Sequence, residues 1–284
     1  MARWAESKSH GAHIPFLTEM NKLEGNRDIS AGNVRGFVLC GGQGTRLRSV
    51  VSDRPKSMAL ISGTPFLQLL LARLRSQGVD DVVLGTGYMA EKIERYFADG
   101  KQFALRIRYS REHEPLGTGG ALKLAESLIS DPVLVLNGDS YVEWNLVPVL
   151  ELFKTKGADL VILLQAVSDV TRYGSVTLDQ DGRVTQFVEK GVAVGPGLIN
   201  AGVYLLRKQI VRNLPAGTAI SLEREVFPRL LDRRVYGLIS TGLFIDIGMP
   251  DDLKRAQTLL TSRVGAASHD SSAIVSPKVH GDMT

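Results

Sequence analysis

The residues with the clearest chemical potential in this 284-residue chain are three closely spaced glycines followed by an arginine. Gly41, Gly42 and Gly44 come directly after an apolar run that ends at Cys40, and Arg46 stands just beyond the last glycine. Glycines at the carboxyl end of a buried strand let backbone N–H groups surround an anion, and a guanidinium binds phosphate oxygens bidentately. The stretch therefore predicts a phosphate-binding loop; the alternative is a tight strand-to-helix turn.

A second cation follows in the pair Pro55-Lys56, where the proline stiffens the turn. Two cations beside a glycine-rich loop suit a triphosphate, or the pyrophosphate that leaves it. Neither of the two common phosphate-binding patterns explains the loop. The P-loop string G-x-x-x-x-G-K-[ST] is absent from the chain, and the dinucleotide fingerprint is broken in this loop by Leu47.

Two aspartates stand where a metal ion could be held. Asp139 follows the apolar run 132–136, and Asp246 follows a second β-like run. Mg²⁺ takes one or two carboxylates and completes its octahedral shell with phosphate oxygens and water. A single aspartate in such a place is also often a helix cap. The five histidines show no metal-ligand spacing, so the sequence predicts a magnesium site and no histidine-based zinc site.

Two other glycine-rich stretches need an explanation. Glu114–Ala121 precedes a helical pattern, so it is either a nucleotide contact or an ordinary helix entry. Gly85–Ala90 matches G-x-G-x-x-A after a strand and supports the runner-up hypothesis, a dinucleotide-dependent oxidoreductase. That fingerprint expects an acidic residue about 20 positions later, at the end of the next strand. The next strand pattern ends near 109–111, with Glu112 only beyond it, so the match is weak.

These motifs need a scaffold that brings strand ends to one edge. In the first half of the chain, apolar runs of strand length alternate with apolar residues at helical spacing, which indicates βαβ units and a mostly parallel sheet with helices on both faces. The expected strands cover 34–40, 81–84, 103–109, 132–136 and 159–165, and the expected helices cover 65–77, 90–97, 118–127 and 145–154.

After Tyr173 the pattern changes. Two alternating runs, 174–178 and 183–189, flank Asp179–Gly182, and Asp-Gly between such runs is typical of a β-hairpin. A further strand is expected over 199–205. The predicted fold class is therefore α/β: a Rossmann-like, mostly parallel sheet flanked by helices, with antiparallel strands added in the second half.

Composition narrows the class of protein without naming a substrate. The hydrophobic fraction of 44% and charged fraction of 23% suit a globular domain, and the net charge of +4 is scattered rather than gathered in a stripe that would bind nucleic acid. The single cysteine excludes a disulfide framework and fits the cytoplasm, and no signal peptide or membrane span is expected. We expect a flexible extension over 1–33, the folded domain over 34–260 and a tail over 261–284.

Taken together, the motifs resemble the signature of the sugar-1-phosphate nucleotidyltransferases, whose fold is the GT-A-like nucleotide-diphospho-sugar transferase fold. The resemblance covers residues 34–260, and its motifs occur in the family's order. It rests on Gly41–Leu47, Pro55-Lys56, Leu116–Ala121, Asn137–Asp139, Glu189-Lys190, Asn200–Gly202 and Asp246–Gly248. The stretches 48–53 and 115–121 are most similar to the D-glycero-α-D-manno-heptose 1-phosphate guanylyltransferases, close relatives of the mannose-1-phosphate guanylyltransferases. The family's loop often has Leu or Met where this chain has Gln43.

The resemblance implies a reaction and a set of roles. GMP from GTP would be transferred to a sugar 1-phosphate, with release of pyrophosphate, to make a GDP-sugar for capsule or lipopolysaccharide synthesis. Arg46 and Lys56 would be catalytic, and Asp139 and Asp246 would hold Mg²⁺. Nucleotide contacts would come from Cys40, Gly41, Gly42, Gly44, Thr45, Arg46, Gly87, Leu116, Gly117, Thr118, Gly119 and Gly138. Acceptor contacts would come from Gly174, Glu189, Lys190 and Asn200.

Other hypotheses stay open at this point. Besides the oxidoreductase, the chain could be a non-catalytic, nucleotide-sugar-binding regulatory subunit, although such a relative would be expected to lose Arg46, Lys56 or a metal aspartate. Mannose could replace heptose as the sugar, or another base could replace guanine. No nucleic acid or membrane partner is expected, and a homo-oligomer is a family-level expectation.

Overall fold

The central sheet is built outward from β1 (Arg35–Leu39), which pairs in parallel with β4 (Asp81–Thr86) on one side and β6 (Val133–Asn137) on the other. β4 in turn pairs in parallel with β5 (Arg106–Arg111). The inner strands β1, β4 and β6 are largely apolar because both faces of a parallel sheet are covered, whereas the edge strand β5 carries three arginines. The computed structural model describes residues 34–188 and 190–269, and all of them lie in one compact unit.

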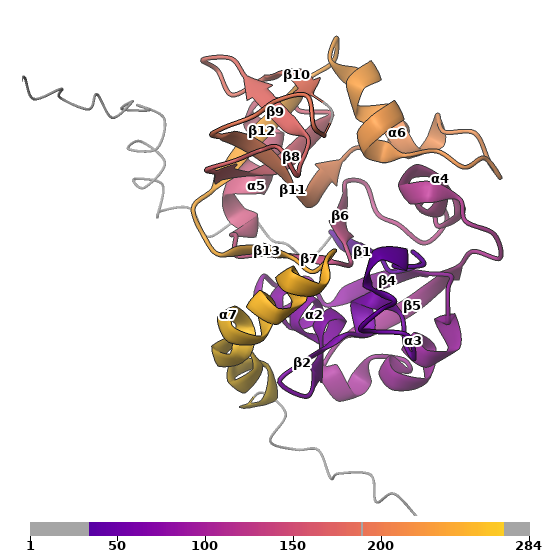
Figure 1. Ribbon diagram of the computed structural model, residues 1–284. Helices are drawn as coiled ribbons and strands as arrows, with labels where there is room; N and C mark the ends of the chain where they lie inside the picture. Colours follow the sequence, from indigo (N-terminus) through magenta and orange to yellow (C-terminus); the bar gives the residue numbers. More distant parts are fainter. Residues whose placement is uncertain (1–33, 189, 270–284) are drawn as a thin grey trace, which may run out of the picture. The chain divides into compact units, whose positions relative to one another are not determined.

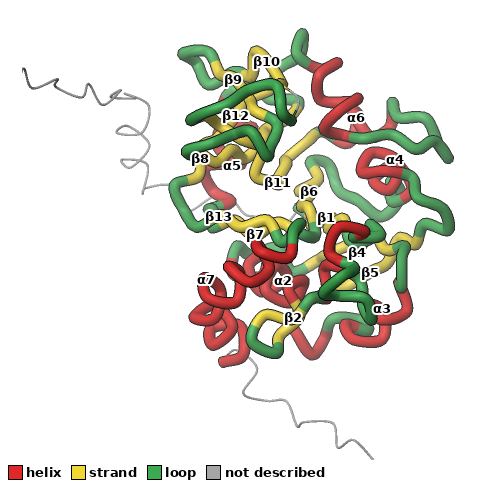
Figure 2. The backbone as a smooth tube through the Cα atoms, in the orientation of Figure 1, coloured by secondary structure: helices red, strands yellow, loops and turns green. Residues whose placement is uncertain are grey.

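Helices connect the parallel strands, as the alternating pattern predicts. α2 (Phe66–Ser76) and α3 (Ala90–Phe97) lead to β4 and β5, and α4 (Gly117–Leu124) leads to β6. α5 (Leu146–Thr155) precedes β8, and its first turn is capped by the side chain of Asn145. In Figures 1 and 2, α2 and α3 gather around β4 and β5, at the end of the sheet opposite the antiparallel strands.

The second half of the described chain adds the antiparallel strands. β11 (Gly197–Leu206) lies antiparallel to β6 and also to β8 (Leu160–Val167). β9 (Ser175–Leu178) and β10 (Val184–Val188) form the expected hairpin, and β12 (Val235–Ser240) runs parallel to β8. Together with the parallel strands they complete a nine-stranded mixed sheet within the described residues. The predicted fold class is confirmed.

A second, much smaller sheet ties the two halves of the chain together. β7 (Ser140–Val142) starts just after β6, and β13 (Phe244–Asp246) pairs with it in antiparallel fashion. Ser140 lies opposite Asp246 in this ladder, and the backbone N–H of Ile247 donates to the carbonyl oxygen of Asp139. The ladder thus fixes two distant aspartates side by side.

The remaining elements are short, apart from the last helix. β2 (Leu60–Ile61) and β3 (Thr64–Pro65) form a two-stranded hairpin, and α6 (Lys208–Arg212) follows β11. The single-turn helices are η2 (Thr45–Leu47), η3 (Lys56–Met58), η4 (Lys101–Phe103), the π-helix η5 (Leu222–Val226) and η6 (Phe227–Leu230). α7 (Pro250–His269) packs against α2 and β2.

Three expected boundaries differ from the structure by three residues or more, and the others agree more closely. The expected tail from residue 261 starts inside α7, because Ala256 and Leu260 dock the helix and extending a formed helix costs little. β5 begins at Arg106 rather than residue 103, because η4 turns the chain first. α4 ends at Leu124 rather than residue 127. The expected extension over 1–33 lies outside the described residues. No helix among the described residues is long and apolar enough to cross a bilayer.

Candidate active site

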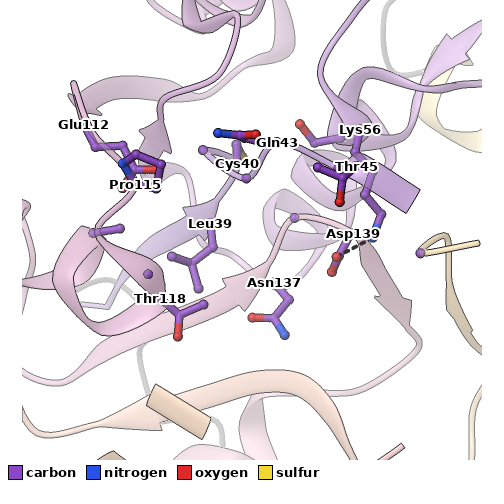
Figure 3. A pocket seen from close by; sticks show the side chains of 18 of the residues that line it. Leu39, Cys40, Gln43, Thr45, Lys56, Glu112, Pro115, Thr118, Asn137 and Asp139 are labelled. Carbon is purple, nitrogen blue, oxygen red and sulfur yellow. Dashed lines mark hydrogen bonds and ion pairs between the residues drawn. The ribbon is translucent and has the colours of Figure 1, made fainter. Parts of the chain in front are cut away.

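A cavity of about 380 Å³ opens at the carboxyl ends of the central parallel strands. It lies where ligands bind in open α/β sheets, outside the strand ends. Most of the residues predicted for phosphate and nucleotide contacts line it: Cys40, Gly41, Gly42, Gly44, Thr45, Arg46, Lys56, Gly117, Thr118, Gly138 and Asp139. Figure 3 shows Glu112 and Pro115 at one side of this cavity, the base end, and Lys56 with Asp139 at the other, the phosphate end.

The glycine loop needs glycine at position 44 for a structural reason. Gly44 has a φ of 59° and a ψ of 34°, the left-handed region, and it starts the turn Thr45–Leu47. A Cβ at this position would also lie only 2.8 Å from Cβ of Lys56. The loop therefore folds tightly onto Lys56 and leaves Arg46 exposed. Within residues 34–188 and 190–269, Arg46 makes no hydrogen bond or ion pair, so its guanidinium is free to bind an anion.

Lys56 lies between the two predicted metal ligands. Its Nζ is 2.6 Å from Oδ2 of Asp139 and 3.9 Å from Oδ1 of Asp246 (Figure 3 draws the first of these contacts). The lysine side chain is mostly buried, with 12% exposed, whereas the aspartates remain partly exposed. The three side chains come from three separate parts of the chain and form one charged cluster, which the β7–β13 ladder holds in place.

The electrostatics of this cluster fit a cation. Burial, and next the negative charge of Asp139, raise the pKa of Asp246, while Lys56 opposes that change. Two carboxylates close enough to repel each other are hard oxygen ligands of the kind that Mg²⁺ takes. No group of three or more His, Cys, Asp and Glu side chains in the described part of the chain could hold a metal by itself. The two carboxylates therefore fit an ion that takes its remaining ligands from a substrate.

Glu112 lines the cavity but is not among the residues predicted from the sequence. Oε2 of Glu112 accepts a hydrogen bond of 3.1 Å from the backbone N–H of Leu116, and the carboxylate lies against the backbones of Gly41 and Gly87. A Cβ at Gly41 would be 2.5 Å from Oε1, so only glycine admits this side chain. Burial raises the pKa of Glu112, and the Leu116 hydrogen bond opposes the increase. No sequence pattern marks Glu112, because the neighbouring His113 and Glu114 suggest an exposed turn.

Three predicted nucleotide contacts lie beside the cavity rather than on its wall. Gly87 adjoins the glycine loop, since the next residue, Tyr88, donates its N–H to the carbonyl oxygen of Gly41. Leu116 and Gly119 exchange backbone hydrogen bonds with Ile220, at 2.9 and 2.8 Å. The N–H of Gly119 is therefore already used within the protein. The glycine-rich stretch thus serves both the cavity and the packing of a distant segment.

A second cavity of about 350 Å³ lies beyond Asp246. Asp246 lines this cavity, and Gly248 lines the first one, so the end of β13 separates the two. The buried carboxylate of Asp252 forms ion pairs with Arg172 and Arg255 on the wall of the second cavity. The other lining residues are Gln165, Ala166, Val167, Ser168, Asp169, Tyr173, Phe244 and Ile245.

The described acceptor candidates, Gly174, Lys190 and Asn200, line neither cavity. The charge of Lys190 acts on Asp246. Gly174 packs against the carbonyl oxygen of Val188, and Asn200 donates a hydrogen bond to Tyr204. Glu189, the other predicted acceptor residue, lies outside the described residues. These four assignments stay predictions.

Comparison with known proteins decides the family. A sequence profile of the nucleotidyl transferase family matches residues 35–263. The chain belongs to the nucleotidyl transferase family. This nucleotidyl transferase is 41% identical to a D-glycero-alpha-D-manno-heptose 1-phosphate guanylyltransferase from Aneurinibacillus thermoaerophilus over 79% of the chain and 97% of the relative. It is 38% identical to a mannose-1-phosphate guanylyltransferase from Mycobacterium tuberculosis over 80% of the chain, but it spans only 64% of that longer relative.

Solved structures agree with this nucleotidyl transferase assignment. HddC from Yersinia pseudotuberculosis, also solved in complex with GMP-PN, superimposes with a TM-score of 0.71 at 38% identity over 79% of this chain and 98% of HddC. A thymidylyltransferase-like structure from Bacillus anthracis, at 21% identity and a TM-score of 0.72, shows the shared fold. The dinucleotide fingerprint at Gly85–Ala90 is therefore a strand-to-helix turn of a transferase, and the oxidoreductase hypothesis is dropped.

Proposed function

We propose that this nucleotidyl transferase moves GMP from GTP to D-glycero-α-D-manno-heptose 1-phosphate and releases pyrophosphate. The observation that carries the proposal is the Lys56–Asp139–Asp246 cluster, which stands at the junction between the nucleotide cavity and the second cavity. A reaction that joins a nucleotide to a second phosphorylated substrate brings two sets of negatively charged phosphates together, and their charge must be neutralised where they meet. The names of the relatives supply the substrate class.

The chemistry needs no protein nucleophile. A phosphate oxygen of the sugar 1-phosphate attacks the α-phosphorus of GTP, the new P–O bond forms, and the bond to the β-phosphate breaks in line so that pyrophosphate leaves. The protein's work is then positioning and stabilisation of charge. Arg46, exposed on the glycine loop, binds the β- and γ-phosphates, and Lys56 neutralises the charge that develops at the α-phosphate.

Asp139 and Asp246 are the residues that would hold Mg²⁺. When bound, the ion would neutralise the oxygens of the triphosphate and of the departing pyrophosphate. Lys56 contributes beside them, because its ammonium lies within 4 Å of both carboxylates and limits their mutual repulsion. Retention of Arg46, Lys56 and both aspartates argues against a non-catalytic regulatory subunit.

Glu112 supports guanine as the base. The Watson–Crick edge of guanine carries two neighbouring donors, N1–H and the N2 amino group, and an ionised carboxylate accepts from both. Glu112 lies at the base end of the cavity, away from Lys56, and its carboxylate keeps lone pairs beyond the one used by Leu116. Adenine presents an acceptor at N1, so the same carboxylate would repel it.

The acceptor pocket is the part of the proposal that concerns the sugar. The second cavity, beyond Asp246 from the nucleotide cavity, is the space that we propose for the sugar. Gly174, Glu189, Lys190 and Asn200 stay the proposed acceptor contacts, and the charge of Lys190 acts on Asp246. The polar wall formed by Gln165, Ser168 and Asp169 suits a polyhydroxylated chain. The wall does not distinguish the two sugars; the names of the guanylyltransferase relatives support heptose 1-phosphate, with mannose 1-phosphate as the alternative acceptor. We place the enzyme in the cytoplasm, in keeping with its single, buried cysteine.

A pyrophosphate-release assay with four nucleoside triphosphates and two sugar 1-phosphates tests the function. The expected result is release with GTP and heptose 1-phosphate in the presence of Mg²⁺, and slower release with mannose 1-phosphate. Faster turnover with ATP, UTP or dTTP would contradict the assignment of guanine. Absence of turnover with every pair would contradict the proposed reaction itself.

A further inference from the structure

Glu223 is the centre of a hydrogen-bond network that the reaction scheme does not use. Its two carboxylate oxygens accept from three hydroxyl groups: Oε2 from Thr118 at 2.8 Å and Ser221 at 3.0 Å, and Oε1 from Tyr204 at 3.1 Å. It lies in the π-helix Leu222–Val226, and such helices are rare overall but are often found at functional sites. A carboxylate that collects three donors at a π-helix needs an explanation.

One branch of the network ends at the nucleotide cavity. Thr118 lines that cavity and stands in the first turn of α4. Its hydroxyl donates to Glu223 and accepts from the backbone N–H of Leu222 at 2.8 Å, so both functions of the hydroxyl are fixed by η5. The segment before η5 holds the same stretch through the backbone hydrogen bonds of Ile220. Hydrogen bonds therefore hold the part of the cavity wall that contains Thr118 against η5.

The other branch ends on β11 at Asn200, a proposed acceptor contact. The Tyr204 hydroxyl donates to Glu223 and accepts from Nδ2 of Asn200 at 2.9 Å. Oδ1 of Asn200 accepts from the backbone N–H of Gly202 at 2.8 Å, so the amide is held at both ends. One N–H of the amide remains for a ligand. Tyr204 itself is fully buried and lines neither cavity, and its hydroxyl also interacts with the side chain of Asn137, which lines the nucleotide cavity.

We propose that Glu223 is a positioning residue that couples the two substrate sites, holding Thr118 on the nucleotide side and, through Tyr204, Asn200 on the acceptor side. This inference rests on the proposed function, because it takes Asn200 as an acceptor contact. An ionised carboxylate only accepts, so it forces the hydrogens of Thr118 and Tyr204 toward itself and fixes which atoms they present outward. Occupation of one site then orders the network for the other.

Substitution at Glu223 separates coupling from mere structural support. Glu223→Gln keeps the shape but turns one acceptor into a donor, and we expect it to raise KM for GTP and KM for the sugar 1-phosphate about tenfold each, the size usual for residues in one network. kcat changes by less than about threefold, and the melting temperature is preserved. Glu225→Gln is the matched control in the same helix. Among the described residues the exposed side chain of Glu225 accepts a hydrogen bond only from the Ser221 N–H, so both KM values should remain near wild type.

A second pair of variants follows the network from each end. Tyr204→Phe removes one hydroxyl and touches no substrate, yet we expect it to raise KM for GTP at least threefold besides KM for the sugar 1-phosphate. Thr118→Val should raise both KM values in the same way, and Thr118→Ser, which keeps the hydroxyl, should restore them. A change in one KM only, or equal effects of Glu225→Gln and Glu223→Gln, would overturn the coupling.

Calorimetry distinguishes this inference from the proposed function. In the wild type, mannose 1-phosphate and the α,β-methylene analogue of GTP, whose bond to the β-phosphate cannot be cleaved, should each bind more tightly when the other is present, by the same factor. Glu223→Gln should abolish this mutual effect. If the wild type binds the analogue and the sugar phosphate cooperatively but releases no pyrophosphate from GTP, the proposed reaction fails while the coupling stands. If the two bind independently in the wild type, the coupling fails.

Discussion

The phosphate end and the base end of the nucleotide cavity are assembled in different ways. At the phosphate end, Lys56, Asp139 and Asp246 come from three distant parts of the chain and form one charged cluster. At the base end, a single carboxylate, Glu112, is enclosed by glycine backbones and fixed by one N–H. Under the proposed function, charge neutralisation therefore depends on three charged side chains that meet, whereas base recognition depends on one carboxylate and the backbone that encloses it. We therefore expect the phosphate end to control the rate of turnover and the base end to control which nucleotide is used.

Removal of divalent metal should have the largest effect on turnover, and it should act only at the phosphate end. With excess chelator we expect pyrophosphate release to fall below detection, because the charge of the triphosphate and of Asp139 and Asp246 is then left without its ion. Added Mg²⁺ should restore turnover, and the melting temperature of the ligand-free protein should not change. Full activity in chelator would remove both aspartates from their proposed role.

Lys56→Ala should lower kcat by about 10³-fold, since a preorganised cation at the point of developing charge contributes at this level. The variant should also melt earlier than wild type, because Asp139 and Asp246 lose the cation between them. Steady-state kinetics and thermal melting check the two effects. Lys101→Ala, a surface lysine with an 87% exposed side chain, serves as the control and should behave as wild type. An unchanged kcat in Lys56→Ala would contradict the assignment.

Glu112→Gln should act at the base end, with a smaller effect of a different kind. We expect kcat/KM for GTP to fall roughly 10- to 100-fold, with kcat nearly unchanged, and the preference for GTP over ATP to shrink. The amide oxygen still accepts one hydrogen bond, but the amide nitrogen opposes a guanine donor. Glu114→Gln, two residues away and exposed, is the matched control and should leave the preference intact. Retention of full preference by Glu112→Gln would place base recognition elsewhere.

The smallest expected effect is on stability and its pH dependence. Because burial raises the pKa of Glu112, the native state holds a proton that the unfolded state has lost, over the interval between the ordinary carboxyl pKa and the higher native pKa. Wild-type stability should therefore fall as pH rises through that interval. Glu112→Gln lacks this titration. As pH rises through the interval, the melting temperature of the variant relative to that of the wild type should therefore increase by on the order of 1 °C, a small shift because the carboxyl is only half-buried. If the melting temperatures of wild type and Glu112→Gln change with pH in the same way, the raised pKa of Glu112 is contradicted.

Features that depend on local sequence could be predicted. The strands before Gly41 and Asp139, the helix at Ala90–Phe97 and the hairpin at Asp179–Gly182 are encoded by neighbouring residues, and the structure has them there. The glycine loop was also recognisable, because three glycines after a strand have few uses. Each predicted metal aspartate stands at the end of a short apolar run, as the sequence indicates.

Features that depend on distant contacts could not be predicted from periodicity. That Asp139 and Asp246 lie side by side follows from a three-residue ladder, too short to leave a pattern. Glu112 is enclosed by glycines from two other loops, and Glu223 meets Thr118 across 105 positions of sequence. The N–H of Gly119, predicted to face the nucleotide, is used instead by the carbonyl of Ile220.

The pairing of β13 with β7 also has a consequence for protein synthesis. Domains form from the N-terminus as the chain leaves the ribosome, at about 5–20 residues per second. A nascent chain that ends before Phe244 already contains the glycine loop, Lys56 and Asp139, but it lacks the strand that brings Asp246 beside them. Under the proposed function, nucleotide affinity and turnover should therefore appear at different chain lengths.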